Sequence, residues 1–502
     1  MSQFPKHLLI SACLGAAIVA LPAFASEATI ASPHERCAGT DAAGEKSPVP
    51  ADPYPLMAAG WGPELGGGLM ASRWAEDWTG MAAAQRVPAL KALSLGDTAI
   101  LTLSAEARYR YVAVDNNRLV RGNDMRQGQL RGIVGADLRL NPHVRFYGEL
   151  GTGQVDRERE EAAANFQNRL SLQQLFVDVR GSAGPSPAGT TLVGAMLGRQ
   201  EFADGPRQLI SLSDGPNLHR SWNGMRLYAH APRYRLGAFE LRATRLENGG
   251  FDDGIRADTI LRGINGSVIV SRGDGPNTYL DPFWFHTELP DFRFGNEAGT
   301  DRRDTFGLRL WGRKGALRWD WTVARQDGHT LGGRTIDAWG VFAVQSLTLS
   351  GSGWKPKLTS HIDLASGGGV GGDGSLRNFH PLYASSNYLG ESQFLGLSNL
   401  LLVAPGIALA PSATTTLSFE YGYARRLDAD DDAYAGGMRA YAGTRDVPGH
   451  HIGNLMRLSG SWSPSTRLSF NFNVEHLAAG HFLREAGFYS GTYAQLGATY
   501  RY

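Results

Sequence analysis

Arginines that alternate with apolar residues are the groups in this sequence best placed to do chemistry. Between Leu101 and Tyr111 the odd positions carry apolar or aromatic side chains, and the even positions include Arg108 and Arg110. A guanidinium group can pair with a carboxylate through two parallel hydrogen bonds. A row of arginines on one face of a strand therefore favours contact with carboxylate-bearing molecules.

The same pattern recurs along the chain. The alternate positions carry thirteen arginines but only eight acidic residues, although the whole chain is balanced at 49 Lys plus Arg and 48 Asp plus Glu. Arg242 is among these thirteen arginines and Glu240 is among these eight acidic residues, so both are expected to face the interior. The arginines that we expect to contact an anionic substrate are Arg108, Arg110, Arg131, Arg139, Arg145, Arg226, Arg309 and Arg318. The alternative is a lattice of salt bridges that braces the interior, and a working pore needs both paired and available charge.

Other motifs in the sequence give weaker evidence for a binding or catalytic site. The segment 367–372 fits G-x-G-x-x-G, but no helix is expected after it, so a dinucleotide site is not predicted. The acidic run at 428–432 could bind Ca²⁺, although a solvated loop is the preferred interpretation. The pair His450 and His451 would need further ligands to bind zinc. The sequence contains no G-x-S-x-G motif, and we predict no catalytic, metal or cofactor site.

Composition and cysteine content narrow the class of protein. The 502 residues are 42% hydrophobic and 10% aromatic, which excludes a disordered chain. The balanced charge argues against a nucleic-acid partner. Lys6, an apolar run and a small-residue site ending at Ala25 predict a signal peptide cut before Ser26. A lipobox at Cys13 is the alternative. Cleavage at Ala25 leaves only Cys37, so an exported chain would have no internal disulfide.

Period-two alternation continues from Leu101 to the last residue, and no second run of about 18 apolar residues follows the signal. Strands of about ten residues, short turns and long polar connections at 246–303 and 426–452 are typical of outer-membrane barrels. We therefore predict an all-β fold, a transmembrane antiparallel up-and-down β-barrel of about 16–18 strands over residues 96–502. Residues 26–95 lack alternation and are expected to form an N-terminal periplasmic segment. A soluble sandwich shares the alternation and is the alternative.

Several blocks resemble the alginate-export family of outer-membrane porins. They are Arg73-Trp-Ala-Glu-Asp-Trp78, Leu197-Gly-Arg-Gln-Glu201, Asn217-Leu-His-Arg220, Trp222-Asn-Gly-Met-Arg226 and Phe379-His-Pro-Leu-Tyr383. The resemblance implies a monomeric barrel, with 18 strands, that passes polyuronate chains through a basic lumen. It also implies a pore position for Arg199, although Arg199 shares strand parity with Leu197, which is expected to face lipid. Asn223 replaces the acid of a Phe-Asp-Gly triplet common among relatives.

We expect an anion-selective channel in the outer membrane of a Gram-negative cell, carrying an anionic polysaccharide or oligosaccharide by facilitated diffusion. The first alternative is a porin for small anionic or aromatic solutes, and the second is a closed enzyme or adhesin barrel. The expected partners are outer-membrane lipid and lipopolysaccharide, the barrel-assembly machinery and periplasmic export proteins.

Overall fold

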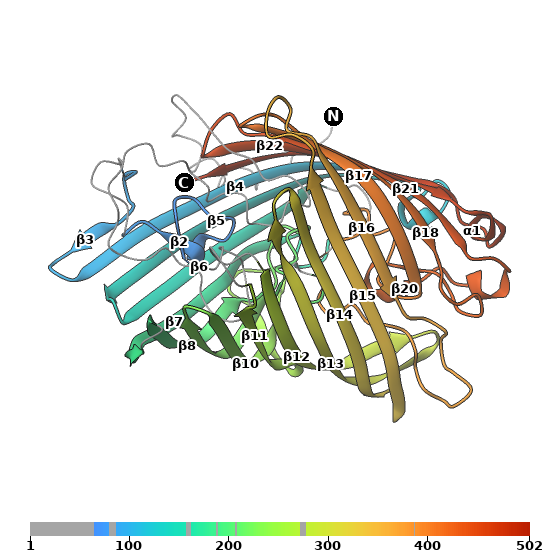
Figure 1. The fold of residues 1–502 in the computed structure, drawn as a ribbon, viewed down its shortest axis with the longest axis horizontal. Coiled ribbons are helices and arrows are strands. Elements are labelled where there is room, and N and C mark those ends of the chain that lie inside the picture. Colours follow the sequence, from blue (N-terminus) through green and yellow to red (C-terminus); the bar gives the residue numbers. More distant parts are fainter. Residues whose placement is uncertain are drawn as a thin grey trace, which may run out of the picture.

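A closed β-barrel forms almost the whole of the chain (Figure 1). The computed structural model describes residues 65–79, 87–156, 162–186, 189–205, 208–271, 278–385 and 387–502. Eighteen long antiparallel strands pair with their neighbours in sequence, and β23 pairs with β4 to close the barrel. The predicted fold class is confirmed, and the strand number lies at the upper end of the expected range.

The barrel strands follow one another along the chain with two small hairpin strands inserted before β21. The first nine are β4 (Ala99–Asp115), β5 (Met125–Asn141), β6 (Val144–Asp156), β7 (Asn168–Ser186), β8 (Gly189–Glu201), β9 (Ser221–Ala231), β10 (Tyr234–Arg245), β11 (Gly254–Ile269) and β12 (Thr278–Phe294). The second nine are β13 (Glu297–Lys314), β14 (Leu317–Thr330), β15 (Arg334–Thr348), β16 (Lys357–Ala365), β17 (Leu400–Ser412), β18 (Thr415–Arg425), β21 (His451–Trp462), β22 (Leu468–Ala479) and β23 (Gly491–Arg501).

Short elements decorate the barrel. They are β1 (Gly66–Gly67), β2 (Glu76–Asp77), β3 (Leu93–Leu95), β19 (Tyr434–Ala435), β20 (Arg439–Ala440), the helix α1 (His481–Glu485) and four single-turn 3-10 helices, η4 (Arg73–Ala75), η5 (Asn117–Leu119), η6 (Gly436–Met438) and η7 (Thr444–Asp446). Among the described residues, these helices are too short to cross a bilayer.

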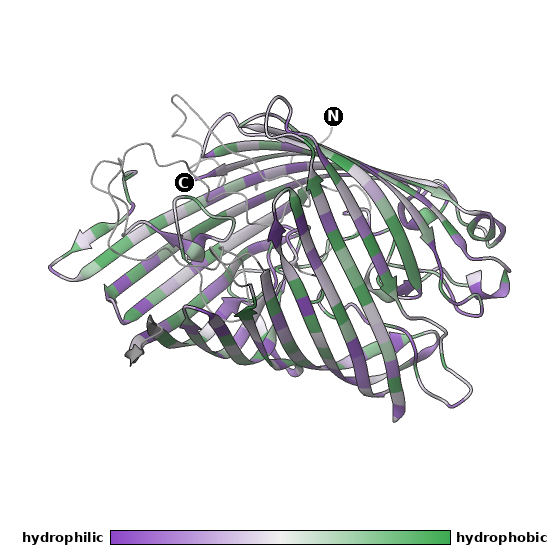
Figure 2. Ribbon diagram, in the orientation of Figure 1, coloured by the Kyte–Doolittle hydropathy of each residue, from purple (hydrophilic) through white to green (hydrophobic). Residues whose placement is uncertain are grey.

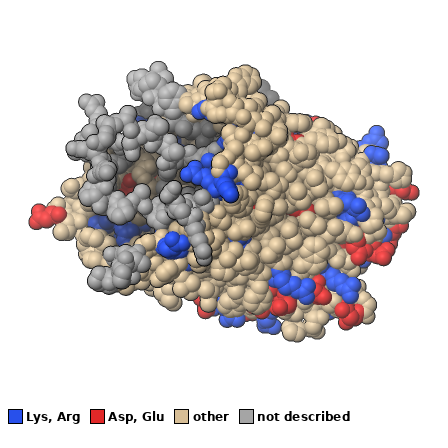
Figure 3. Space-filling view, in the orientation of Figure 1, with Lys and Arg blue, Asp and Glu red and all other residues tan. Residues whose placement is uncertain are grey.

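Alternate residues of each strand face opposite sides of the barrel wall, so apolar and polar bands follow one another along the ribbons in Figure 2. Tyr109 is 51% exposed on the outer side, whereas the neighbouring Arg108 is 3% exposed and faces inward. Figure 3 shows that most of the outer surface between the two ends of the barrel is uncharged. This arrangement buries apolar side chains in lipid and keeps polar ones in the interior.

The two ends of the barrel differ in the length of their connections. The turns after β5, β9, β13 and β17 contain two residues each, and Gly315 in the turn after β13 adopts a φ of +57° that favours glycine. The connections at the opposite end include 202–220, 366–399 and 426–450. Since outer-membrane barrels carry short periplasmic turns and long extracellular loops, the end that bears α1 is extracellular (Figure 1).

The predicted long connection at 246–303 is wrong, because this stretch contains β11, β12 and the start of β13. Alternation is obscured there by apolar residues on the inward face, such as Leu261 and Phe285, which are 0% and 1% exposed. These side chains pack against Phe202 and Ile210 of the connection after β8 in one hydrophobic cluster. A loop that folds into the barrel therefore removes the polar pattern that a water-filled lumen would impose.

The extracellular connections fill much of the barrel interior. Phe379, Phe394 and Leu397 join inward-facing residues of the wall, such as Phe342 and Leu402, in the same buried cluster. The interior thus has an apolar core on the side of β10–β18. Most of the charged residues described below lie along β4–β9, and a second, smaller group surrounds Arg309 on β13.

Residues 65–79 lie inside the barrel against β4–β8, with Trp74 packed against Phe176 and hydrogen-bonded to Glu201. The predicted signal peptide with its cleavage site near Ala25, the lipobox alternative and much of the expected 26–95 segment lie outside the described residues. Residues 65–79 of that segment occupy the lumen side of the wall, whereas β3 extends the sheet by pairing with the start of β4.

Candidate functional site: an arginine cluster in the lumen

Eight of the nine predicted contact arginines lie on the inward face of the barrel. Their neighbours in sequence, such as Leu130, Met225 and Leu308, are 41–46% exposed on the outside. The inward residues are Arg108 and Arg110 on β4, Arg131 and Arg139 on β5, Arg145 on β6, Arg226 on β9, Arg309 on β13 and Arg318 on β14. Strand parity therefore assigned these side chains to the correct face.

Arg199 faces away from the lumen, and the pore position implied by the family resemblance is not observed. It pairs in register with Leu175, which is 55% exposed on the outer face. Its guanidinium donates hydrogen bonds to Asn223 Oδ1 (2.9 Å) and to the carbonyl of Leu172 (2.8 Å). Arg242 lies outside as well, and pairs with Glu240 at 2.8 Å, so strand parity was misjudged for both members of this pair.

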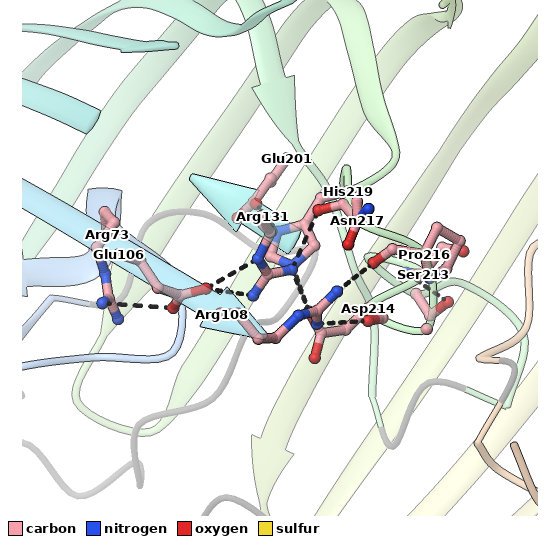
Figure 4. Close-up of polar contacts among 12 residues, drawn as sticks. Arg73, Glu106, Arg108, Arg131, Glu201, Ser213, Asp214, Pro216, Asn217 and His219 are labelled. Atoms are coloured by element: carbon pink, nitrogen blue, oxygen red, sulfur yellow. Dashed lines mark hydrogen bonds and ion pairs between the residues drawn. The ribbon is translucent and has the colours of Figure 1, made fainter. Parts of the chain in front are cut away.

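The connection 202–220 enters the barrel and places Asp214 among three arginines of the wall (Figure 4). Asp214 Oδ1 lies 3.0 Å from Arg108 Nη1 and 2.7 Å from Arg131 Nη1, and Oδ2 lies 3.6 Å from Arg110 Nη2. Arg108 also donates to the carbonyl of Pro216 at 2.5 Å. The Asp214 side chain is one-third exposed, whereas the three arginines are at most 8% exposed.

These contacts control the charge of Asp214. Burial opposes ionisation, but Arg131 and Arg108 outweigh that cost and hold the pKa of the Asp214 carboxyl well below its ordinary value. The carboxylate is therefore ionised at neutral pH. Three wall arginines thus bind one carboxylate that belongs to a loop.

His219 links the same loop to the wall. Its Nδ1 lies 2.5 Å from Glu201 Oε1 on β8, and its Nε2 lies 2.6 Å from Asp214 Oδ1. Burial disfavours the charged imidazole, but Glu201 outweighs that effect and raises the pKa of His219 to about 9. The imidazolium can then donate to a carboxylate at each nitrogen.

Glu106 on β4 joins the cluster to more distant parts of the chain. It accepts hydrogen bonds from Arg131, and its other oxygen lies 2.9 Å from Arg501 Nε on β23 and 3.6 Å from Arg73 Nη1. Since all these groups are nearly inaccessible to solvent, removal of one partner would leave a buried charge without compensation. The cluster therefore braces the wall as well as offering positive charge.

The segment 65–79 pairs with the remaining arginines of β5 and β6. Asp77 lies 2.8 Å from Arg139 Nη1, and the carbonyl of Trp74 accepts a hydrogen bond from Arg145. Burial opposes ionisation of Asp77, but Arg139 holds its pKa below the ordinary value. Both arginines also pair with Asp137 on β5.

On the far wall, Arg309 pairs with Asp281 (3.1 Å) and Asp320 (2.6 Å), and Arg226 packs its guanidinium over Phe202. The predicted arginines therefore all have interaction partners in the folded chain, including Arg199, whose Nη1 lies 4.0 Å from Asp253 Oδ2. The salt-bridge lattice foreseen as an alternative is present, and the arginine cluster at Asp214 is part of it.

The sequence model for alginate export matches residues 99–496. The chain belongs to the alginate export family. No curated protein matches it. Among solved structures it is similar to Pseudomonas aeruginosa OccK9 (OpdG), with 12% identity and a TM-score of 0.52. It is similar to P. aeruginosa OccK2 (OpdF) in complex with glucuronate, with 13% identity and a TM-score of 0.51. It is also similar to P. aeruginosa OpdK with vanillate, with 15% identity and a TM-score of 0.50. Each match covers 80% of this chain and 97–98% of the other chain, and shows a shared fold.

This member of the alginate export family is an outer-membrane β-barrel channel. In its acidic run at 428–432, Asp430 is exposed, as expected for a solvated loop, whereas Asp431 and Asp432 are buried. Asp431 accepts hydrogen bonds from Asn378 and Tyr434, both at 2.8 Å, and Asp432 pairs with Arg445 at 2.7 Å. No group of three or more metal-ligating side chains occurs in the described residues, and these aspartates instead hold extracellular connections together.

Several residues of the arginine cluster were not predicted from the sequence. Asp214, His219 and Glu201 lie in or beside the connection 202–220, and alternation carries no information about residues in a loop. The family-like block at 217–220 was a signal for His219, because a motif inside a long connection indicates a constrained conformation. The role of Arg73 in the lumen depends on contacts that only the tertiary structure defines.

Proposed function

We propose that this channel passes an anionic polysaccharide or oligosaccharide of the polyuronate class, similar to alginate, by facilitated diffusion. The observation that carries the proposal is the convergence of Arg108, Arg110 and Arg131 on the single carboxylate of Asp214. A cluster that already binds one carboxylate has the charge and geometry to bind another.

The mechanism is an exchange of carboxylates. A uronate group that approaches the partly exposed Asp214 competes with it for the arginines, and the loop carboxylate competes in turn for release of the substrate. Conduction requires binding that is strong enough for entry and weak enough for exit. Paired acids such as Glu106 and Asp137 prevent the arginine wall from trapping a polyanion.

The similar structures support carboxylates as the chemical class. The OccK2 structure contains glucuronate and the OpdK structure contains vanillate, and both ligands carry a carboxylate. The vanillate complex favours a second candidate function, a porin for small anionic or aromatic solutes. The two functions differ in whether the length of the solute matters.

Reversal potentials of the refolded protein in planar bilayers under a KCl gradient test the proposal. We expect anion selectivity and a block by mannuronate oligomers that strengthens with oligomer length. Arg131→Gln should reduce both, whereas Arg199→Gln, which removes an equal charge from the outer face, should change neither. Anion selectivity without length-dependent block supports the small-solute porin, and the absence of conductance supports a closed barrel.

We propose that the channel works in the outer membrane of a Gram-negative cell. The chain acts without catalysis or a cofactor, as a monomer, after cleavage of a signal peptide near Ala25. Outer-membrane lipid, lipopolysaccharide and the barrel-assembly machinery are its general partners. Periplasmic export proteins are the partners specific to polymer transport.

A further inference from the structure

A polar cavity lies on the extracellular side of the arginine cluster. It has a volume of about 300 Å³ and is lined by residues of three connections and two strand ends: Ala164, Asn165, Ser213, Leu218, His219, Arg220, Ser221, Thr244 and Leu246. This volume is at the lower end of the range for small-molecule sites. Ser213 and His219 also border the Asp214 cluster (Figure 4), so the cavity adjoins the candidate site.

Arg220 distinguishes this cavity. Its Nη1 donates to the carbonyl oxygens of Tyr383 (2.8 Å) and Ser211 (3.3 Å), and its guanidinium lies over the Tyr383 ring at 5.0 Å. Within the part of the chain that the structure describes, no carboxylate lies within ion-pair distance of Arg220. The wall arginines of the cluster, in contrast, each have at least one acidic partner.

The environment of Arg220 penalises its charge. Burial without a carboxylate lowers the pKa of Arg220 to about 10, and the guanidinium still remains protonated at neutral pH. Arg220 is half-buried, and a cation that is partly removed from water is stabilised by an anionic partner. An anion in the cavity would supply the missing partner, and a carboxylate matches the two-pronged geometry of a guanidinium.

The rest of the lining is suited to a sugar ring. Asn165, Ser221 and Thr244 offer amide and hydroxyl groups, and Leu218 and Leu246 offer apolar surface. Ser221 and Thr244 are held in place by a mutual hydrogen bond of 3.0 Å. A carboxylated sugar presents hydroxyls, a carboxylate and an apolar ring face. These groups match the polar side chains, Arg220 and the leucines of the lining, respectively.

From these observations we infer that the cavity at Arg220 is an extracellular uronate subsite, separate from the lumen cluster, in which Arg220 binds the sugar carboxylate. This inference rests on the proposed function and adds to it a second binding site, lined by extracellular connections. A uronate at Arg220 lies next to Asp214 and His219, so the two sites are placed to pass a chain from one to the other.

The test is the affinity for sodium glucuronate, measured by isothermal titration calorimetry on the full mature chain in detergent, with glucose as the neutral probe. Arg220→Gln is expected to weaken glucuronate binding about tenfold or more, because it removes a charge-assisted hydrogen-bond donor pair. Arg220→Lys keeps the charge but loses the fork, so an intermediate loss is expected. Arg169→Gln, at an exposed arginine of the same rim, is the matched control and should bind as the wild type does.

Ala164→Trp provides a second variant that fills the cavity and leaves Arg220 in place, and it should also weaken binding. Heat-modifiable gel mobility reports whether each variant is folded. Glucuronate affinity that is unchanged in both Arg220→Gln and Ala164→Trp would overturn the subsite. If those variants bind normally while the wild-type channel is anion-selective and blocked by oligomers, the subsite fails and the proposed function stands. A non-selective, unblocked wild-type channel is the failure of the proposed function.

Discussion

Replacing His219 by glutamine is expected to loosen the connection 202–220 at neutral pH and to have little effect at alkaline pH. The protonated imidazole bridges Glu201 and Asp214, whereas glutamine carries no charge. Arg131 also contacts His219 from β5, and its positive charge opposes protonation. The measured pH dependence therefore reports the balance between two carboxylates and one guanidinium.

The magnitude follows from the pKa of His219, which rises from 6.5 to about 9 in the folded loop. At about 1.4 kcal/mol per pKa unit, this displacement corresponds to about 3 kcal/mol of loop stability. Since the folded pKa is raised, this stability is fully present below pH 6.5 and is lost as the pH rises through about 9. An energy of this size changes the population of a released loop by about 100-fold.

The assay uses the buried Pro216 as a reporter. Pro216→Cys, in a chain with Cys37→Ser, should react with a maleimide only when the loop leaves the wall. The ratio of labelling rates between His219→Gln and unchanged His219 is compared at each pH, which cancels the intrinsic reactivity of the thiol. We expect a ratio up to about 100 below pH 6.5 that approaches one above pH 9. A ratio that does not vary with pH would refute the reasoning, and His143→Gln at an exposed periplasmic turn is the control.

Three further predictions concern the lumen and the lipid face. Asp214→Asn removes the loop carboxylate from the arginine cluster and should shift the reversal potential towards stronger anion preference; an unchanged potential would contradict the exchange mechanism. Trp74→Ala should release the segment 65–79 from the lumen, since loss of a buried aromatic costs about 3–5 kcal/mol, and the release is measured as increased protease sensitivity and conductance. Leu496→Arg, at a side chain that is 65% exposed in the middle of β23, should destabilise the barrel by about 2–4 kcal/mol in urea titrations in lipid vesicles, and equal stability would place Leu496 outside the bilayer.

Much of the wall could be predicted because a β-strand has a strict period of two. Once Tyr109 and Leu130 are taken to face lipid, Arg108 and Arg131 must face the interior. The same rule failed at β11 and β12, where Leu261 and Phe285 make the inward face apolar. It also failed for Arg242, since Glu240 and Arg242 interrupt the apolar pattern of the outer face.

Pairing of the arginines could not be predicted in the same way. The partners of Arg131 are Glu106, 25 residues away on β4, and Asp214, 83 residues away in a loop. No local pattern encodes contacts at such separations, because they depend on strand register and on the path of a loop through the barrel. The site at Arg220 has the same origin, because its lining comes from segments that only the folded loops bring together.

The sequence by itself determined the class of fold, the lipid-facing stripe and the inward position of most arginines, because these follow from local alternation and hydrophobicity. The tertiary structure decided which of those arginines are paired, that the segment 65–79 enters the lumen, and that the connection 202–220 presents Asp214 to the wall. The physical reason is that the two kinds of interaction connect residues over different distances along the sequence. Burial in lipid acts on each residue separately, whereas a charge in a low-dielectric interior is controlled by whichever partner the fold places beside it.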